Sequence, residues 1–163
     1  MMNSKVNALA LVLAVAPILM AAPASADDMA DVKAVIDAYV ATETDLVNQA
    51  KLMTDDRVYI VGGARFTDNV ANMRGQIAGQ KLNRELDPDG TMIVTAEDVM
   101  IRIYGDAAVA SFYRHWNYTP GADAVRAGRP GGSPPSQVTT VVLAKDGGDW
   151  NIVHTHISPM AAN

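Results

Sequence analysis

The chain has 163 residues, no cysteine and a formal net charge of −5. This length is typical of one domain with a sizeable core, and the acidic balance argues against nucleic acid as a partner, because nucleic acids bind basic surfaces. A cysteine-free chain has no disulfides, so its core and any contacts between copies must keep it folded.

The first 26 residues have the pattern of a secretory signal peptide. Lys5 supplies a positive charge, residues 6–22 are almost entirely apolar, and Ala24-Ser25-Ala26 offers small residues at the cleavage positions. A membrane anchor is the alternative, but an apolar run of about 17 residues that a proline interrupts is marginal for a span. We therefore expect a periplasmic or secreted protein, without membrane attachment after cleavage, whose single domain covers residues 27–163.

Helical periodicity opens the predicted domain. Apolar residues recur at three- and four-residue spacing, which predicts an amphipathic helix over about Met29–Glu43: Val32, Val35, Ile36, Tyr39 and Val40. Thr44 is placed to cap a short continuation through residues 46–53. A short strand over 57–61 follows, and residues 66–86 are mixed in character, with a short helix as the expected content.

The apolar period changes to two after the Asp87–Gly90 turn, which predicts β-strands. Glycine-containing turns separate strands over residues 91–104, 107–118, 137–145 and 150–158. The connection Thr119–Ser136 has four glycines and four prolines, and a loop of this length is usually functional or mobile. Helices followed by an antiparallel meander indicate an α+β domain.

Alternation along the second long strand gives one aromatic-rich row: Ala110, Phe112, Arg114, Trp116 and Tyr118. We expect the helix to cover this row together with Val138, Thr140 and Val142 of the third strand and Val153 and Ile157 of the last. Arg114 is then a buried cation and needs an acceptor. Glu43 at the end of the helical stripe is one candidate partner, and the carboxylate of a bound ligand is the other.

The three histidines are the candidates for a metal site. His154 and His156 share a face of the last strand, opposite Val153 and Ile157 and together with Trp150 and Ile152. His115 is expected on the same side but two strands away, and no acidic cluster accompanies the pair, so we expect no metal. Nucleotide-binding and nucleophile-elbow motifs are also missing from the sequence, and no cofactor is expected.

The second half of the chain contains a set of short motifs: Gly105-Asp106-Ala107-Ala108, Phe112-Tyr113-Arg114, Tyr118, Gly128-Arg129-Pro130, Asp146-Gly147 and the closing pattern Trp150-x-x-Val153-His154-x-His156-x-Ser158. With these motifs the chain resembles the association (hub) domain of calcium/calmodulin-dependent protein kinase II, and more broadly the nuclear-transport-factor-2-like (NTF2-like) and SnoaL-like superfamily. The resemblance covers about Val99–Ser158.

The resemblance implies a cone-shaped α+β fold, a cystatin-like roll in which N-terminal helices pack in the concave face of a bent antiparallel sheet. It also implies a pocket between them and a homo-oligomer, most simply a dimer, formed through the outer sheet face. The hub pocket holds several arginines and binds small carboxylates. Only Arg114 carries over, because Thr140 and Ile157 stand where the hub has arginine, so this pocket should be less cationic and more apolar.

Three hypotheses about function follow from the sequence. The first is a small-molecule-binding protein whose pocket takes an apolar molecule with a carboxylate or carbonyl end. Arg114 and Tyr118 would orient that end, and the other expected pocket residues are Phe112, Trp116, Tyr39, Thr140 and Glu43.

The second hypothesis is a proton-transfer enzyme, an isomerase, cyclase or dehydratase, because the superfamily contains such enzymes. That chemistry needs a buried carboxylate of raised pKa, with Glu43 as the best candidate and Asp55 and Glu97 behind it. Related isomerases place their base on the strand after the second helix, and residues 58–61 here hold no carboxylate, so no catalytic residue is assigned. The third hypothesis is an oligomeric assembly module.

Overall fold

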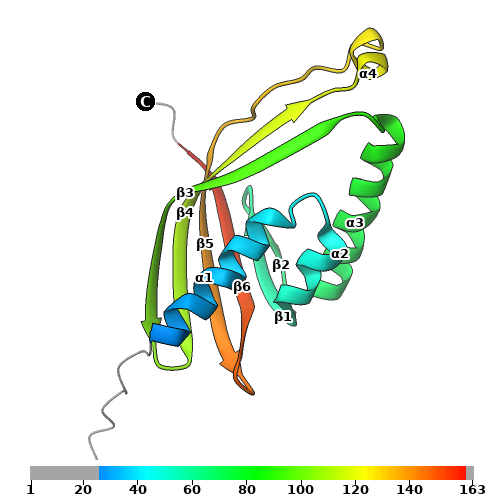
Figure 1. Ribbon diagram of the computed structural model, residues 1–163. Coiled ribbons are helices and arrows are strands. Elements are labelled where there is room, and N and C mark those ends of the chain that lie inside the picture. Colours follow the sequence, from blue (N-terminus) through cyan, green and yellow to red (C-terminus); the bar gives the residue numbers. More distant parts are fainter. Residues whose placement is uncertain (1–25, 161–163) are drawn as a thin grey trace, which may run out of the picture.

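The computed structural model describes residues 26–160, so residues 1–25 of the predicted signal peptide lie outside the described part. Helices and strands follow in the order α1 (Ala26–Ala41), α2 (Leu46–Gln49), the 3₁₀ helix η1 (Ala50–Leu52), β1 (Met53–Val61), β2 (Ala64–Phe66), α3 (Asn69–Leu86), β3 (Thr91–Tyr104), β4 (Ala107–Thr119), α4 (Ala122–Arg126), β5 (Gln137–Asp146) and β6 (Asp149–Pro159) (Figure 1).

A single curled sheet of six strands, in the order β2-β1-β6-β5-β4-β3, forms one layer, and the helices pack against it (Figure 1). The α+β fold class predicted from the sequence is confirmed. The sheet is mixed, however, and not wholly antiparallel, because β1 pairs with β6 in the parallel direction. None of the helices within residues 26–160 is both long and apolar enough to cross a membrane.

The predicted helical stripe is the centre of the core. Val32, Ile36 and Tyr39 of α1 are 0–2% exposed, as expected for residues one turn apart on one helix face. They belong to a cluster that includes Ala108, Ala110 and Phe112 of β4, Val141 and Leu143 of β5, and Trp150 and Ile152 of β6. The aromatic row of β4 therefore faces the helix, as the sequence predicted.

The inner face of β5 differs from the prediction. Thr139, Val141 and Leu143 are completely buried, and Thr139 pairs with Phe112 of the inner row. Val138, Thr140 and Val142 alternate with these residues and lie on the outer face, so their predicted placement was wrong. The cause is that β5 carries β-branched or aliphatic residues on both faces, and only its register beside β4 decides which face is covered.

The inner face of β6 was predicted only in part. Leu143 pairs with Ile152 and Val142 with His154, so Val153 is the extra residue of a β-bulge. The bulge reverses the alternation, so Trp150 and Ile152 lie in the core and Val153 does not belong to the inner row. Beyond it the predicted arrangement holds, with Thr155 and Ile157 buried and His154 and His156 on the opposite face.

The mixed segment after β2 contains a longer helix than expected. α3 spans 18 residues and begins after Asp68, whose side chain accepts a hydrogen bond from the Ala71 amide as an N-cap. Only Asn69 and Met73 of this helix are buried, so its sequence shows little of the apolar stripe that predicts a helix. The cap of α2 also differs, because Asp45 and not Thr44 receives the Asn48 amide.

Leucine-to-alanine substitutions should cost far more stability in the assigned core than on the surface. Leu143→Ala removes a completely buried side chain and should lower the free energy of unfolding by about 2–5 kcal/mol, because the site cannot fully collapse around the cavity. Leu82→Ala on α3 is the matched control, since Leu82 is 55% exposed and should change it by less than about 0.5 kcal/mol. Chemical denaturation measures both values, and equal losses would contradict the assigned core.

Candidate functional site

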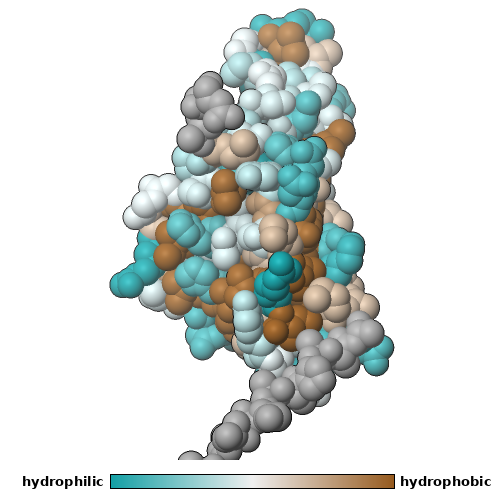
Figure 2. All heavy atoms as spheres, turned by 90° about the vertical axis from the view of Figure 1, so that its left-hand side faces the viewer, coloured by the Kyte–Doolittle hydropathy of each residue, from teal (hydrophilic) through white to brown (hydrophobic). Residues whose placement is uncertain are grey.

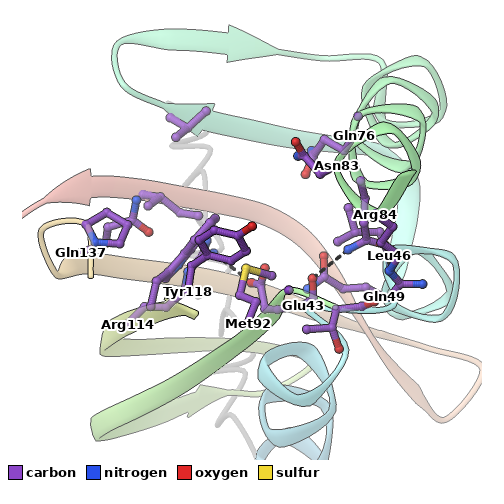
Figure 3. Close-up of a pocket in the computed structure, with 18 of the residues that line it drawn as sticks. Glu43, Leu46, Gln49, Gln76, Asn83, Arg84, Met92, Arg114, Tyr118 and Gln137 are labelled. Carbon is purple, nitrogen blue, oxygen red and sulfur yellow. Dashed lines mark hydrogen bonds and ion pairs between the residues drawn. The ribbon is translucent and has the colours of Figure 1, made fainter. Parts of the chain in front are cut away.

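A cavity of about 810 Å³ lies between the helical layer and the inner face of the sheet. This volume is within the range of about 300–1,000 Å³ that is usual for small-molecule sites. Residues from α1–α3, the α1–α2 turn, β1, β3–β6 and the loop before β5 line it. Figure 3 shows that the sheet residues Arg114, Tyr118 and Gln137 lie on one side and the helical residues Gln76, Asn83 and Arg84 on the other.

A buried ion pair lies in the cavity wall. Arg114 Nη1 is 2.9 Å from Glu43 Oε1, and the two side chains are 5% and 8% exposed. Glu43 lies in the turn after α1 and Arg114 in the inner row of β4, so the pair joins the two layers. Burial raises the pKa of Glu43, while the neighbouring positive charge of Arg114 acts in the opposite direction.

Donor groups beside this ion pair have no partner among residues 26–160. They are Arg114 Nε and Trp116 Nε1, both buried. The Arg114 guanidinium also lies over the Trp116 ring, 4.7 Å from its centroid. Buried donors without partners are costly, so an oxygen acceptor placed at this part of the wall would form favourable hydrogen bonds.

A second buried guanidinium was missed by the sequence analysis. Arg57 of β1 is 2% exposed and lines the cavity with Tyr59 and Val61 of the same strand. Its Nε donates to Asn69 Oδ1 at 2.9 Å and its Nη1 donates to Thr155 Oγ1 at 3.3 Å. The signal was present in the sequence, because Arg57, Tyr59 and Val61 alternate along a short strand and so share one face.

A hydrogen-bonded group closes the end of the cavity where α3 meets β3. The carboxylate of Asp87 accepts a hydrogen bond from the Tyr118 hydroxyl. It also accepts from the Gly121 amide, which lies 3.1 Å from Oδ1 and 3.2 Å from Oδ2. A side chain at Gly90 would displace this group, because a Cβ there would be 2.5 Å from Asp87 Oδ2. Arg129 Nη1 donates to the Tyr118 oxygen at 3.4 Å. The hydrogen bond from Tyr118 lowers the pKa of Asp87 and raises that of Tyr118.

The structure brings five of the seven predicted pocket residues to the cavity: Tyr39, Glu43, Arg114, Trp116 and Tyr118. Phe112 is instead enclosed in the core at 3% exposure. Thr140 pairs with Ser111 and His156 on the outer face, so its predicted place in the pocket was wrong for the reason given for β5. Tyr118 lines the cavity, but its hydroxyl already donates its hydrogen bond to the Asp87 carboxylate.

The other candidate bases and the histidines lie elsewhere. Asp55 is exposed, and Glu97, 69% exposed, is 3.3 Å from His115 Nε2. Asp87 is the second buried carboxylate of the cavity, which the sequence analysis treated only as a turn residue. No group of three or more histidine, aspartate or glutamate side chains within residues 26–160 is arranged to hold a metal ion.

The profile of the SnoaL-like domain matches residues 32–162 of the chain. No protein with a curated description matches it significantly. An NTF2-like protein with a cystatin-like fold from Novosphingobium aromaticivorans is similar in structure, with 18% identity, a TM-score of 0.65 and 84% of each chain covered.

Two further solved structures share the fold. A proposed dehydratase of the NTF2-like family from Streptomyces avermitilis has 16% identity and a TM-score of 0.63, over 83% of this chain and 98% of that one. A proposed ketosteroid isomerase from Shewanella frigidimarina has 17% identity and a TM-score of 0.60, over 77% of this chain and 92% of that one. At this identity the likeness establishes the fold, which agrees with the cystatin-like roll expected from the sequence.

The Asp87 group should make the protein acid-sensitive. Because the pKa of Asp87 is lowered from its usual 3.8, its ionised form stabilises the fold above that pH, and the contribution is lost as the pH falls through the lower native value. Asp87→Asn should therefore lower the melting temperature at pH 7, with a difference from the unsubstituted protein that shrinks below about pH 4. The exposed Asp89→Asn is the control, and a difference independent of pH would contradict this role.

Proposed function

The chain belongs to the SnoaL-like family, and from this premise we propose that it is a periplasmic or secreted small-molecule-binding protein. Its cavity takes an apolar molecule with a carboxylate or carbonyl end. The observation that carries the proposal is the buried Arg114, which lies in a cavity of ligand size with its Nε free of any partner among the described residues. Apolar and aromatic walls with a few converging polar groups are typical of such sites.

Tyr39 and Trp116 provide the aromatic walls of this site, and Arg114 provides the polar end. Burial raises the pKa of Tyr39 far above its ordinary value, so its phenol stays protonated at physiological pH. The ion pair with Glu43 uses one nitrogen of Arg114, and the remaining donors can bind a ligand oxygen. A charge-assisted hydrogen bond in a buried site supports both affinity and orientation.

The outer face of the sheet supports a homodimer. Exposed apolar side chains of β3 to β5 lie on this face and are accessible to a second copy: Ile93, Met100, Tyr104, Tyr113 and Val138. Figure 2, which views the side where β3 and β4 lie in Figure 1, shows apolar residues interspersed with polar ones. Patches of this kind often mark contacts between proteins. An oligomeric assembly module related to the kinase hub, with no ligand in its cavity, is a weaker proposal, because it leaves the partnerless donors of the cavity wall without a role.

Protein recovered from the periplasm of its own host should carry its ligand. Native mass spectrometry should show a dimer of chains that begin at Asp27, with an added small-molecule mass per subunit.

Arg114→Ala should then weaken the binding of the released compound by about 1.5–3 kcal/mol, the scale of a charge-assisted hydrogen bond.

Arg102→Ala is the matched control for this substitution, because Arg102 is exposed on β3 and donates only to its neighbour's carbonyl. Circular dichroism must accompany the titration, since Arg114→Ala leaves Glu43 buried without its cation. Unchanged affinity in folded Arg114→Ala protein would defeat the assignment of Arg114.

A proton-transfer enzyme is the second candidate, and one observation favours it. The cavity holds two carboxylates whose pKa values move in opposite directions, raised for Glu43 by burial and lowered for Asp87 by hydrogen bonds. Such a division is common in sites of acid–base catalysis. The solved structures proposed as a dehydratase and a ketosteroid isomerase have the same fold.

Turnover assays decide whether this chemistry occurs. If the cavity isomerises β,γ-unsaturated ketones or dehydrates β-hydroxy ketones, ultraviolet absorbance will detect the conjugated product. Glu43→Gln should then lower kcat by about 10²–10⁴-fold, the usual contribution of a general base, whereas the exposed Glu97→Gln should not. Absence of turnover over both substrate classes would reject the enzyme proposal and leave the binding proposal standing.

A further inference from the structure

The cavity is positively charged although the protein is acidic. Four arginines and two acidic residues line it, whereas the whole chain has a formal charge of −5. The excess is greatest in the interior, where Arg57 and Arg114 are 2% and 4% exposed and Glu43, at 7%, is the one buried carboxylate near them among the described residues. An interior with unbalanced positive charge favours an anion.

Arg57 is the source of this imbalance. None of the ion pairs within residues 26–160 includes it. Its partners Asn69, Thr155 and the sulfur of Met73 are neutral, and the Tyr59 ring lies 4.8 Å from its guanidinium carbon. Burying a guanidinium without a counter-charge costs free energy of folding. An anionic ligand that paired with Arg57 would offset this cost.

Glu43 does not neutralise both cations. It is paired with Arg114 at 2.9 Å, and one carboxylate balances one guanidinium at most. Burial also raises the pKa of Glu43, and a protonated Glu43 would leave both cations uncompensated. A positive excess therefore remains in either protonation state.

Arg57 lies away from the Asp87–Tyr118 end of the cavity. Its Nη1 contacts Thr155, which pairs with Val141, which in turn pairs with Ala110 of β4. Tyr118 is eight residues further along β4 than Ala110. At the Tyr118 end the hydroxyl donates to Asp87 and Arg129 donates to the hydroxyl, whereas the interior cations lie away from the Asp87 carboxylate and can bind a ligand anion.

We propose that Arg57, the cation without a counter-charge, supplies the net positive charge for the ligand's anionic group beside Arg114, so that the cavity selects an organic monoanion such as a carboxylate over a neutral carbonyl compound of the same shape. This inference rests on the proposed binding function and identifies its ligand class. The planar guanidinium matches a carboxylate with two parallel hydrogen bonds, and only three of its five N–H groups have partners within the described chain.

Pairs of acids and amides test the charge selectivity directly. Benzoate, 2-naphthoate and 4-phenylbutyrate are each compared with the corresponding amide by isothermal titration calorimetry at pH 7. The unsubstituted protein should bind at least one acid about tenfold or more tighter than its amide, the scale of one charged contact. Arg57→Met should bring that ratio to within about threefold of unity, while the exposed Arg65→Met on β2 should leave it unchanged.

The outcomes separate this inference from the proposed function. Equal binding of acids and amides by the unsubstituted protein, or an acid preference that survives in Arg57→Met, would overturn the role of Arg57 and leave a binding protein for neutral molecules. Failure of every acid and amide to bind would contradict the proposed function as well. Should Arg57→Met fail to fold, Arg57→Lys is the substitute, because lysine keeps the positive charge but lacks the two parallel N–H donors of the guanidinium. It should lower the ratio of acid to amide affinity several-fold, and an unchanged ratio would overturn the role of Arg57.

Discussion

The buried ion pair between Glu43 and Arg114 is the contact on which the arrangement of the layers depends. Separating the partners would leave a charge in the interior, so the turn after α1 must lie over the inner row of β4. Gln80 of α3 strengthens this position, because it donates to the Glu43 carbonyl at 3.0 Å and accepts from the Leu46 amide. At the other end of α1, Lys145 of β5 lies 2.5 Å from Asp28. Polar contacts therefore fix both ends of the helix whose centre is apolar.

A fold selected for stability alone would not keep this interior. Replacing a buried ion pair by apolar side chains is often neutral or stabilising, and filling a cavity adds contacts. Here the chain retains two buried guanidiniums, donor groups without partners and an open volume of about 810 Å³. Stability is commonly sacrificed in this way at functional sites. Arg57, Arg114 and Trp116 all line the same cavity, and this coincidence identifies the site independently of any relative.

The sequence predicted features that depend on local periodicity and missed those that depend on distant packing. The stripe of α1 and the inner row of β4 each held one charged residue among apolar ones, so the Glu43–Arg114 pair could be proposed. The face of β5 could not be chosen because both faces are apolar, and the bulge at Val153 has no local signal. Arg57 shares a strand face with Tyr59 and Val61, but its burial and that of Asp87 could not be predicted, because the elements that cover them include α3 and the loop before β5, whose packing is not encoded in an apolar stripe.

The two ends of the cavity impose opposite conditions on charge. At the Tyr118 end, hydrogen bonds favour the ionised form of Asp87, and Arg129 lies nearby. In the interior, burial disfavours the ionised form of Glu43, while the neighbouring charges of Arg114 and Arg57 act in the opposite direction. A ligand anion that reached Arg114 would share its guanidinium with Glu43. The binding and enzymatic proposals therefore differ in the role of one residue. A binding protein can leave Glu43 paired or protonated, whereas a general base must be ionised and free of Arg114 when the substrate's proton is transferred.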